Sequence, residues 1–393
     1  MTTKTQVAII GAGPAGLTLS LLLNRSGIDC IVLENRSRAY VEARVRAGLL
    51  EQNTVDLYNE LGVADRLNKE GLLHHGVYLS FNGQRKRIPF NELTGGRTIT
   101  IYGQQEVVKD LIKANIERGT PIQFEAAATC IEGSDTKHPK VHYQQDGEQH
   151  ILECDFVAGC DGYHGIGRKS LPTNSYNEFV KEYPFSWLGI LAHAAPSTDE
   201  LIYAYHERGF ALHSLRSPKV SRLYLQVDNA DKVENWTDDQ IWDELQVRLS
   251  NGNGFQLNRG EIFEKAITPM RSFMIDNMQF GRLFLAGDAA HIVPPTGGKG
   301  LNLAVADVKW MAAALEDWYR TGKEQLLQSY SSNCLRRIWR AQDFSNFMTY
   351  LFHKQAAQGS FEYHLQKSRF DYIGQSNAQA TTIAENYVGL KEI

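Results

Sequence analysis

The segment that most constrains this chain is Gln6–Gly16, where an apolar run breaks into three closely spaced glycines. The β-branched residues within positions 7–10 predict a buried parallel strand, and the leucines after Gly16 predict a helix. Gly11 allows the tight turn between them, Gly13 lets a pyrophosphate approach the backbone, and Gly16 lets the helix pack closely on the strand. The N–H groups at the helix start would then face the phosphates. The pattern predicts a dinucleotide site.

An acidic residue stands where such a site needs one. Glu34 follows a second apolar run, Cys30–Leu33, and a carboxylate there can accept hydrogen bonds from a ribose hydroxyl. The rival interpretation is a signal peptide or a membrane span, because Thr5–Asn24 carries no charge. Three glycines and a proline interrupt that stretch, and it shows no small-residue cleavage site, so a strand, turn and helix fit it better. We therefore expect no membrane segment.

Composition narrows the class of protein. The 393 residues are enough for two hydrophobic cores, and 42% hydrophobic with 22% charged residues is usual for a globular enzyme. The net charge of −4 gives no reason to expect nucleic acid or an anionic membrane as a partner. The five cysteines form no Cys-x-x-Cys pair, and the histidines form no His-Glu-x-x-His motif. The sequence therefore predicts a cytoplasmic protein without a disulfide scaffold or a bound metal.

The periodicity of apolar residues divides the chain into three parts. We expect a nucleotide-binding domain over residues 1–180, an antiparallel substrate-binding domain over 181–270, and over 271–393 a return to the first domain followed by helices. An irregular tail is expected to end the chain. The segments expected to be helical are 55–69, 106–118, 302–320 and 324–350, and those expected to be strands are 77–81, 98–102, 156–162, 187–191, 201–205, 210–213, 222–227 and 282–288.

Three separate segments indicate that the dinucleotide is a flavin. The glycine loop is joined by Cys160–Gly162 and by Gly287–His291, each at the end of a buried strand, and a Gly/Pro-rich loop then opens a helix near Leu301. Backbone N–H groups in such a loop can line an electron-rich ring edge. Reduction of a flavin puts negative charge on the N1–C2=O edge of its ring, and a helix N-terminus stabilises that charge. We therefore expect FAD.

The chain resembles the single-component flavoprotein aromatic hydroxylases nearly from end to end. The stretches that carry the resemblance are Arg44–Gln52, Ala158–Gly165, Leu285–Asn302 and Ala384–Leu390, and they are typical of members that act on 4-hydroxybenzoate. The resemblance implies a mixed α/β fold, with a Rossmann-like FAD-binding domain, an inserted antiparallel-sheet substrate domain and a C-terminal helical section. It also implies that NAD(P)H reduces the FAD, that O₂ forms a flavin C4a-hydroperoxide, and that the product is 3,4-dihydroxybenzoate (protocatechuate). A homodimer through the C-terminal helices is implied as well.

The resemblance assigns cofactor contacts to single residues. Those implied to contact FAD are Gly11, Gly13, Gly16, Glu34, Arg44, Gln104, Asp288, Leu301 and Asn302. Those implied to contact NAD(P)H are Arg46, His164 and Arg271, with Arg36, Arg38 and Tyr40 setting the coenzyme preference. The NADPH-preferring members carry arginine where Asn35 stands here, so we expect NADPH to work and NADH to be used to a significant extent.

The substrate contacts are also implied by the resemblance, and one of them has independent support. The substrate carboxylate is implied to meet Ser214, Arg216 and Tyr224. The period-two spacing of Ser214 and Arg216 puts a hydroxyl and a guanidinium on one strand face, which suits a carboxylate whatever the family. The phenol end is implied to meet Tyr203, Tyr387 and the Pro295 carbonyl, and a proton relay leads from there to His74. Because His75 is adjacent, the sequence leaves open which of these two histidines is buried.

Other functions remain as alternatives. A flavin halogenase would carry a Trp-x-Trp-x-Ile-Pro signature, which this chain lacks. A flavin oxidase or dehydrogenase, a hydroxylase of another hydroxybenzoate or of an aminobenzoate, and a flavoprotein that only binds a ligand are not excluded by the residues. Oxidation of NAD(P)H that is stimulated by an aromatic acid and consumes oxygen separates the hydroxylase from an oxidase and from a binding protein.

Overall fold

A six-stranded sheet is built around the N-terminal apolar strand in the computed structural model, which describes residues 2–46 and 48–390. Ala47, in the stretch Arg44–Gln52, lies outside the described residues. All neighbouring strands pair in parallel except β19 with β20, so the sheet is Rossmann-like, as predicted. The strands in spatial order are β19 (Gln279–Phe280), β20 (Leu283–Leu285), β13 (Phe156–Gly159), β2 (Val7–Ile10), β3 (Cys30–Leu33) and β9 (Ile122–Gln123).

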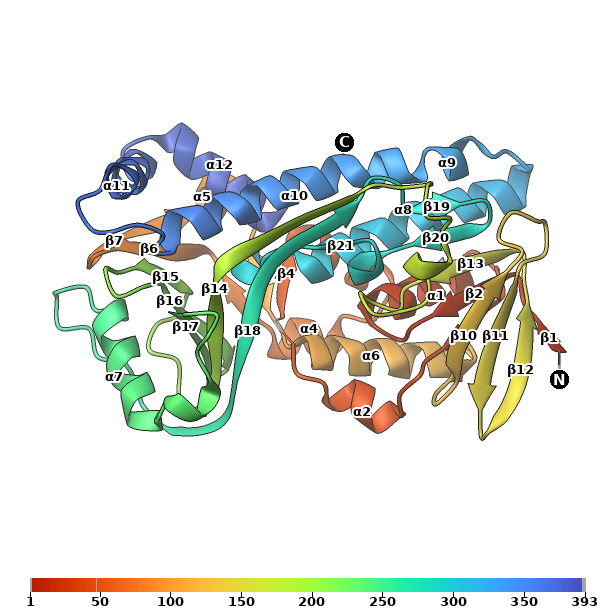
Figure 1. Cartoon of the computed structure of the whole chain (residues 1–393), viewed down its shortest axis with the longest axis horizontal. Helices are drawn as coiled ribbons and strands as arrows, with labels where there is room; N and C mark the ends of the chain where they lie inside the picture. Colours follow the sequence, from red (N-terminus) through yellow and green to blue (C-terminus); the bar gives the residue numbers. More distant parts are fainter. Residues whose placement is uncertain (1, 47, 391–393) are drawn as a thin grey trace.

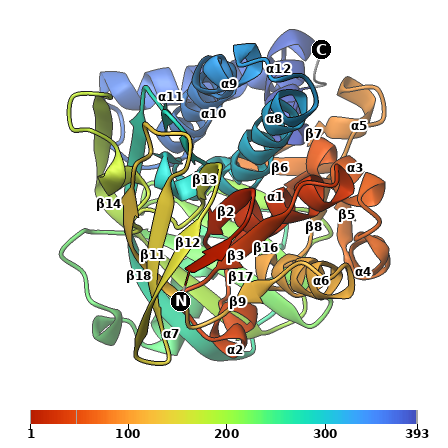
Figure 2. The same cartoon turned by 90° about the vertical axis from the view of Figure 1, so that its right-hand side faces the viewer.

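Helix α1 (Pro14–Arg25) follows β2 and packs against both α6 (Gln104–Glu117) and α8 (Gly300–Thr321) (Figure 2). Because neighbours lie on several sides of it, α1 is buried from Ala15 to Leu23, which explains why this helix is almost entirely apolar. The starts of α1 and α8 lie beside the strand ends that carry the glycine loop and Gly287.

An eight-stranded sheet forms the second large layer (Figure 1). Its strands are antiparallel except for one parallel pair, β15 with β6. The long strands β14 and β18 run from the lobe at the left of Figure 1 toward the first sheet. The strands in order are β21 (His291–Ile292), β18 (Glu261–Ile275), β14 (Glu178–His193), β17 (Val220–Val227), β16 (Ala211–Ser217), β15 (Ile202–Tyr205), β6 (Gly76–Phe81) and β7 (Gln84–Pro89).

Strands β6 and β7 do not follow the predicted three-part division of the chain. They come from within residues 1–180, yet they extend the sheet of the 181–270 segment. The division into domains therefore stays a prediction, and the chain crosses between the two sheets several times. The two smaller sheets are β4 (Leu49–Glu51), β8 (Ile99–Ile101) and β5 (Leu72–His74), and β1 (Thr2–Lys4), β12 (Glu148–Glu153), β11 (Lys140–Gln145) and β10 (Ala127–Glu132).

Two sequence expectations about helices were wrong. The helix expected over 55–69 is two helices, α3 (Gln52–Glu60) and α4 (Asp65–Glu70), because Gly62 between them has a φ of 65°. The tail expected to be irregular forms α11 (Phe361–Ile373) and α12 (Asn377–Val388). Polar residues such as asparagine and threonine weaken the helical signal of α12, but its buried positions recur at helical spacing: Ala380, Ile383, Ala384 and Tyr387.

The remaining helices are α2 (Arg38–Ala43), α5 (Phe90–Leu93), α7 (Asp238–Leu249), α9 (Gln325–Gln328) and α10 (Tyr330–Phe352). A hydrophobic cluster joins the eight-stranded sheet to α10 and α12, and the aromatic side chains of the candidate site lie in it. Among the described residues, no helix combines the length and the apolar composition needed to cross a membrane.

Candidate active site

The first strand–turn–helix unit is closed tightly around two of its glycines. Gly11 has a φ of 105°, and a Cβ atom there would collide with the backbone of Cys160. A Cβ atom at Gly16 would collide with the carbonyl oxygen of Gly11. The Gly11 N–H donates to the carbonyl oxygen of Leu33 at 2.8 Å, which ties the turn to the second strand. Protein contacts alone therefore explain why Gly11 and Gly16 are glycines.

Gly13 has no such explanation within the protein. It is the N-cap of α1 with an ordinary φ of −79°, and a Cβ atom there would meet no heavy atom within 4 Å. Among the glycines that the structure describes, only Gly300, at the start of α8, shares this combination of open space and a φ outside the left-handed region. The two open positions lie at the N-termini of two helices, where an anion or an electron-rich ring edge is favoured. This space fits FAD, with its phosphates at α1 and its ring at α8.

Glu34 connects the glycine loop to the next segment. Its side chain is buried, Oε2 accepts a hydrogen bond from the Ala12 N–H at 2.8 Å, and Oε1 accepts one from the Arg36 N–H at 2.9 Å. Each carboxylate oxygen can accept a further bond. Glu34 can therefore hold the loop in shape and still accept from a ribose hydroxyl.

A buried acid and a buried histidine support the second strand end. Asp307 Oδ2 accepts from the Gly287 N–H at 3.0 Å and lies 2.6 Å from His291 Nε2. Burial alone would lower the pKa of His291, but Asp307 outweighs it and raises the pKa. Gly287 has a φ of 65°, so the turn presents Asp288 as an exposed side chain at the loop surface. Asp307 was missed in the sequence because it lies inside a helix, outside any motif.

The other residues expected to contact FAD lie near the starts or ends of helices. Arg44 is exposed at the end of α2, Gln104 begins α6, and Leu301 is half-buried in the first turn of α8. Asn302 is buried, and its amide is occupied by the protein: Oδ1 accepts from the Glu51 N–H and from the Thr54 hydroxyl, each at 2.8 Å. The Asn302 side chain therefore braces α8 against β4 and α3.

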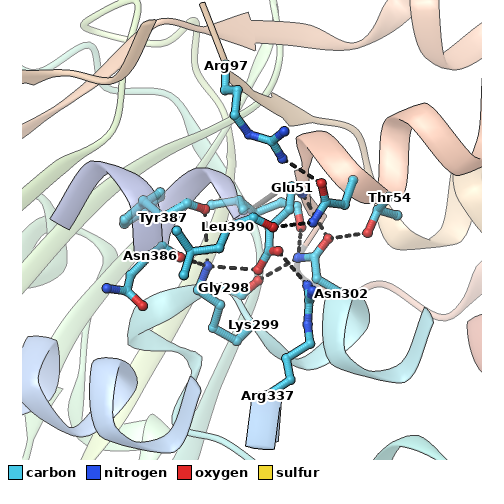
Figure 3. A network of polar contacts seen from close by, with 12 residues as sticks. Glu51, Thr54, Arg97, Gly298, Lys299, Asn302, Arg337, Asn386, Tyr387 and Leu390 are labelled. Atoms are coloured by element: carbon cyan, nitrogen blue, oxygen red, sulfur yellow. Dashed lines mark hydrogen bonds and ion pairs between the residues drawn. The ribbon is translucent and has the colours of Figure 1, made fainter. Parts of the chain in front are cut away.

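A buried ion-pair network joins the start of α8 to the end of α12 (Figure 3). Lys299 Nζ lies 2.8 Å from Glu51 Oε1, and Arg337 lies 2.8 Å from Glu51 Oε2. Burial alone would raise the pKa of Glu51, but the two cations outweigh burial and hold that pKa below its usual value. The Glu51 carboxylate is therefore ionised between two positive charges.

The same network holds the last turn of α12. Lys299 Nζ donates to the carbonyl oxygens of Asn386 and, at 3.1 Å, of Tyr387. Asn53 donates to the Leu390 carbonyl at 2.8 Å, so the chain is fixed on both sides of Tyr387 (Figure 3). Carbonyls at a helix end lack partners within the helix, and a cation there is favoured. The network thus sets the position of the Tyr387 side chain.

Tyr203 and Tyr387, which the resemblance implies for the phenol end of a substrate, form a buried hydroxyl pair. Their oxygen atoms lie 2.5 Å apart although the residues are 184 positions apart in the chain. Burial raises the pKa of both phenols. Both side chains are therefore neutral near pH 7, and each hydroxyl can donate one hydrogen bond and accept others. The pair forms a short chain along which a proton can pass.

One face of the eight-stranded sheet brings Tyr203 into line with the predicted carboxylate clamp. Tyr203 of β15 lies opposite Leu212 of β16, which lies opposite Tyr224 of β17. Ser214 follows Leu212 at an interval of two and so lies on the same face, and Arg216 comes next at a bulge between Leu215 and Ser217. Two strand spacings separate the backbones of Tyr203 and Tyr224, or about 10 Å. The hydroxyl end and the cationic end of the site are therefore held on one rigid surface.

Arg216 lies half-buried beside polar groups of other elements. One of its terminal nitrogens donates to Gln105 Oε1 at 3.0 Å and also contacts the Arg46 carbonyl, while its Nε is buried without a partner. Burial, followed by the nearby Arg222 charge, lowers the pKa of Arg216 to about 10. The guanidinium is thus charged at neutral pH but short of anionic partners, which favours capture of a carboxylate.

His74 is the buried member of the histidine pair, and His75 is exposed. Neither ring nitrogen of His74 has a partner among the described residues. Burial lowers the pKa of His74 to about 4, so the ring is neutral near pH 7. At the other expected phenol contact, the Pro295 carbonyl already accepts from the Gly298 N–H at 3.0 Å, and its second lone pair is the one left for a ligand.

Comparison with protein families matches residues 4–345 to a family described as "FAD binding domain". The matched region includes the glycine loop, the Gly287 turn and both large sheets. This chain belongs to that family of FAD-binding proteins. The sequence predicted a flavin from three separate segments, the open space at Gly13 and Gly300 fits one, and the family assignment agrees with that prediction.

Individual relatives extend the assignment over the whole chain. The p-hydroxybenzoate hydroxylase of Acinetobacter baylyi is 49% identical over 389 residues, covering 99% of this chain and 96% of the relative. A rifampicin monooxygenase of Rhodococcus hoagii is 28% identical and covers 84% of this chain and 67% of its own length. The crystal structure of p-nitrophenol 4-monooxygenase from Pseudomonas putida superposes with a TM-score of 0.86 over 100% of both chains at 17% identity. The fold is therefore that of FAD-dependent aromatic hydroxylases.

The residues implied to contact NAD(P)H in this monooxygenase fall into separate groups. The Arg271 guanidinium lies 3.9 Å from the centre of the Tyr163 ring, which in turn packs edge-on at 5.0 Å against the exposed His164. Arg36 lies 5.2 Å from the Tyr40 ring. In the same short helix, α2, Arg38 pairs with Glu42 at 2.7 Å, and Arg46 is exposed beyond the end of that helix.

Proposed function

We propose that this monooxygenase hydroxylates 4-hydroxybenzoate next to its phenol group, using NAD(P)H and O₂, and releases 3,4-dihydroxybenzoate. The observation that carries the proposal is the single sheet face that bears Tyr203 at one end and Tyr224 at the other, with Arg216 at the bulge that follows Ser214 on the middle strand. A para-substituted benzoate has its two polar groups at opposite ends, which matches this arrangement. The 49% identical p-hydroxybenzoate hydroxylase supports the choice of substrate.

At the carboxylate end, Arg216 supplies charge and Ser214 and Tyr224 supply hydroxyl donors. The guanidinium Nε is buried without a partner, and a planar fork can bind both oxygens of a carboxylate. Binding there would cover the guanidinium and hold the benzoate ring against the sheet. The clamp therefore positions the substrate rather than taking part in bond making.

At the phenol end, the neutral Tyr203 can donate its hydrogen bond to the substrate oxygen. Tyr387 lies 2.5 Å from Tyr203 and can donate to it in turn. A donor chain of this kind stabilises the substrate as a phenolate, and a phenolate ring is more nucleophilic than a phenol. FAD, when bound, would accept electrons from NAD(P)H and activate O₂ for the transfer of one oxygen atom.

The proton released by the phenol needs a path out of the site. Tyr203 can accept it while passing its own proton to Tyr387, and the unpartnered ring of His74 is the proposed acceptor beyond them. Because its pKa of about 4 lies below neutral pH, His74 would hold the proton only briefly before releasing it toward solvent. The surrounding aromatic cluster excludes bulk water from the ring.

We propose that the enzyme works in the cytoplasm as a homodimer, with Arg46, His164 and Arg271 contacting the nicotinamide coenzyme and Arg36, Arg38 and Tyr40 setting its preference. Among the described residues all five cysteines are free, which fits a reducing compartment.

The test is product analysis by the purified enzyme. NADPH or NADH is supplied with 4-hydroxybenzoate, 3-hydroxybenzoate, 3,4-dihydroxybenzoate or 4-aminobenzoate, and product, coenzyme and O₂ are measured together. We expect 3,4-dihydroxybenzoate from 4-hydroxybenzoate, with close to one coenzyme and one O₂ consumed for each product. Oxidation of coenzyme without any aromatic product from this panel would contradict the proposal and favour an oxidase.

A further inference from the structure

A fully buried histidine, His353, lies at the end of α10 and has both of its ring nitrogens occupied. Its Nε2 accepts from the Trp187 indole N–H at 2.6 Å, and its Nδ1 lies 2.8 Å from the Thr349 carbonyl oxygen. An indole nitrogen can only donate and a carbonyl can only accept, so the proton of His353 must be on Nδ1. Burial lowers the pKa of His353 to about 3, and the ring is neutral.

His353 is also the middle of an aromatic stack. The rings of Phe185 and Phe210 lie on either side of it, at 4.4 Å and 4.3 Å between ring centres. The Trp187 ring is stacked on Phe210 at 5.2 Å. Exposure of these four side chains is 3% or less. One hydrogen bond to His353 and one stacking contact with Phe210 therefore hold the indole of Trp187. If His353 lost its acceptor atom, the buried indole N–H would be an unpaired donor.

The fixed indole lies against a residue of the proposed carboxylate clamp. The Trp187 and Tyr224 rings are 4.7 Å apart with planes inclined by 50°. On the neighbouring strand, Gly189 pairs with Tyr224, and a Cβ atom at Gly189 would lie 3.2 Å from the Tyr224 ring. The Tyr224 ring thus lies across a glycine and beside the indole, so its orientation depends on where Trp187 is held.

The same stack reaches the phenol end. Phe210 lies 6.1 Å from the Tyr203 ring, and Phe352, the residue before His353, lies 5.9 Å from it. We propose that the Trp187–His353 hydrogen bond is a positioning pair that fixes the spacing between Tyr224 and Tyr203, and so tunes the site to a para-substituted benzoate. This inference rests on the function proposed above.

The experiment compares four holoenzyme variants with wild type. His353→Phe keeps a flat ring but removes both nitrogens, His353→Gln keeps an acceptor and a donor, Trp187→Phe removes the indole N–H, and the fourth variant combines Trp187→Phe with His353→Phe. For each, the dissociation constant of 4-hydroxybenzoate, the product formed per NAD(P)H oxidised and the melting temperature are measured.

The matched control is Trp242, on the other side of the sheet. Its buried indole donates to the Gly260 carbonyl at 3.2 Å and belongs to a different hydrophobic cluster. Trp242→Phe is expected to lower the melting temperature without changing the 4-hydroxybenzoate dissociation constant or the product ratio.

We expect His353→Phe to weaken 4-hydroxybenzoate binding by up to about 100-fold, because the unpaired indole would turn toward another acceptor and substrate binding would have to return it to its present position. The product ratio should fall with it, and His353→Gln should restore much of both. In the Trp187→Phe background, His353→Phe should have little further effect on binding. If His353→Phe does not fold, Trp187→Phe and His353→Gln carry the same comparison.

Two outcomes overturn the inference in different ways. A wild type that converts 4-hydroxybenzoate, together with pair variants that change only the melting temperature as Trp242→Phe does, would reduce the pair to a structural role. A wild type that forms no product from 4-hydroxybenzoate would contradict the proposed function, and the positioning role with it.

Discussion

The cofactor region and the substrate region of this enzyme are built in different ways. Around the FAD loop, the decisive features are backbone turns within a few residues of one another, such as Gly11, Gly13 and Gly16. In the substrate region, the decisive features are side chains from distant segments, such as Tyr203 and Tyr387, which are 184 residues apart. A short motif can therefore specify the first region, whereas the second depends on the whole fold.

The difference predicts that the two regions can be damaged separately. Changes to substrate side chains should leave FAD binding intact, because the glycine loop and the Gly287 turn make their own contacts. Changes in the glycine loop should remove FAD without disturbing the hydroxyl pair.

Tyr203→Phe should reduce hydroxylation most. The variant keeps the ring but removes the hydroxyl that lies 2.5 Å from Tyr387, and general acid–base groups typically contribute a factor of about 10² to 10⁴. Binding of 4-hydroxybenzoate and of FAD should be close to wild type, and NAD(P)H should still be oxidised with release of hydrogen peroxide. Tyr205→Phe, on the same strand, is the control. A wild-type product ratio in Tyr203→Phe would exclude Tyr203 as the activating group.

Arg216→Lys and Arg216→Ala should weaken substrate binding next. Losing a charged, hydrogen-bonded pair in a desolvated site costs roughly 2–5 kcal/mol, or about 30- to 4,000-fold in the dissociation constant. FAD affinity should not change. The control is Arg248→Lys, because Arg248 is a buried arginine of the same lobe that already has partners, Glu244 and the backbone carbonyls of Phe210 and Gln226. Unchanged 4-hydroxybenzoate binding in Arg216→Ala would rule out the clamp.

Acid should destabilise the substrate region before the cofactor region. Burial lowers the pKa of His74 and His213 to about 4 and of His353 to about 3, against an ordinary value of 6.5. Below pH 6.5 the unfolded chain binds protons that these folded residues do not, so stability falls as the pH drops. Relative to neutral pH, each of these three histidines lowers the free energy of unfolding by about 2 kcal/mol at pH 5. His291 has a raised pKa and acts in the opposite direction.

Hydrogen exchange between pH 7 and pH 5 checks this difference, after correction for the intrinsic exchange rate. Backbone amides of β15 and β16 should lose protection at higher pH than those of β2 and β3. Simultaneous loss in both sheets would show that the two regions do not respond separately to acid.

Gly13→Ala should weaken FAD binding without lowering the stability of the apoprotein. Its Cβ atom would meet no protein atom within 4 Å, so it would occupy only the space where the pyrophosphate is expected. Overpacking of that kind costs about 1–3 kcal/mol, measured as a roughly 5- to 150-fold rise in the FAD dissociation constant. Gly16→Ala is the contrast, since its Cβ atom collides with the Gly11 carbonyl and should lower the melting temperature of the apoprotein. If Gly13→Ala bound FAD as tightly as wild type, the pyrophosphate would not lie next to Gly13.

The smallest effect is expected in coenzyme preference. Asn35 stands where NADPH-preferring relatives carry arginine, while Arg36, Arg38 and Tyr40 remain near the start of α2. One charged contact to a 2′-phosphate is worth about 1.5–3 kcal/mol, so its loss should leave NADPH and NADH within one to two decades of each other. Steady-state kcat/KM for both coenzymes at saturating 4-hydroxybenzoate measures this. A preference beyond about a thousandfold would show that this segment does not set it.

What could be predicted from the sequence follows the same division. The strand–turn–helix at 7–25, Glu34 and the returning strands β13 and β20 were predicted because each is encoded by a few consecutive residues. The Tyr203–Tyr387 pair was implied only by the resemblance, since no local pattern links two residues so far apart.

Three features could not be predicted, for physical reasons. The Glu51–Lys299 ion pair joins positions separated by 248 residues, and no periodicity records such a contact. Strands β6 and β7 join the second sheet through a parallel pairing that their own alternation does not specify. Helix α12 was predicted to be irregular because its surface residues favour other conformations, and packing of Tyr387 and its neighbours outweighs that preference.

The most direct test of the account is the origin of the oxygen in the product. The enzyme is supplied with 4-hydroxybenzoate, NADPH and ¹⁸O₂ in ordinary water, and 3,4-dihydroxybenzoate is analysed by mass spectrometry. We expect one ¹⁸O atom in each product molecule, and a much lower yield of that product from Tyr203→Phe at the same NADPH oxidation. Product whose new hydroxyl carries no ¹⁸O, or the absence of this product while NADPH is oxidised, would contradict the proposed function.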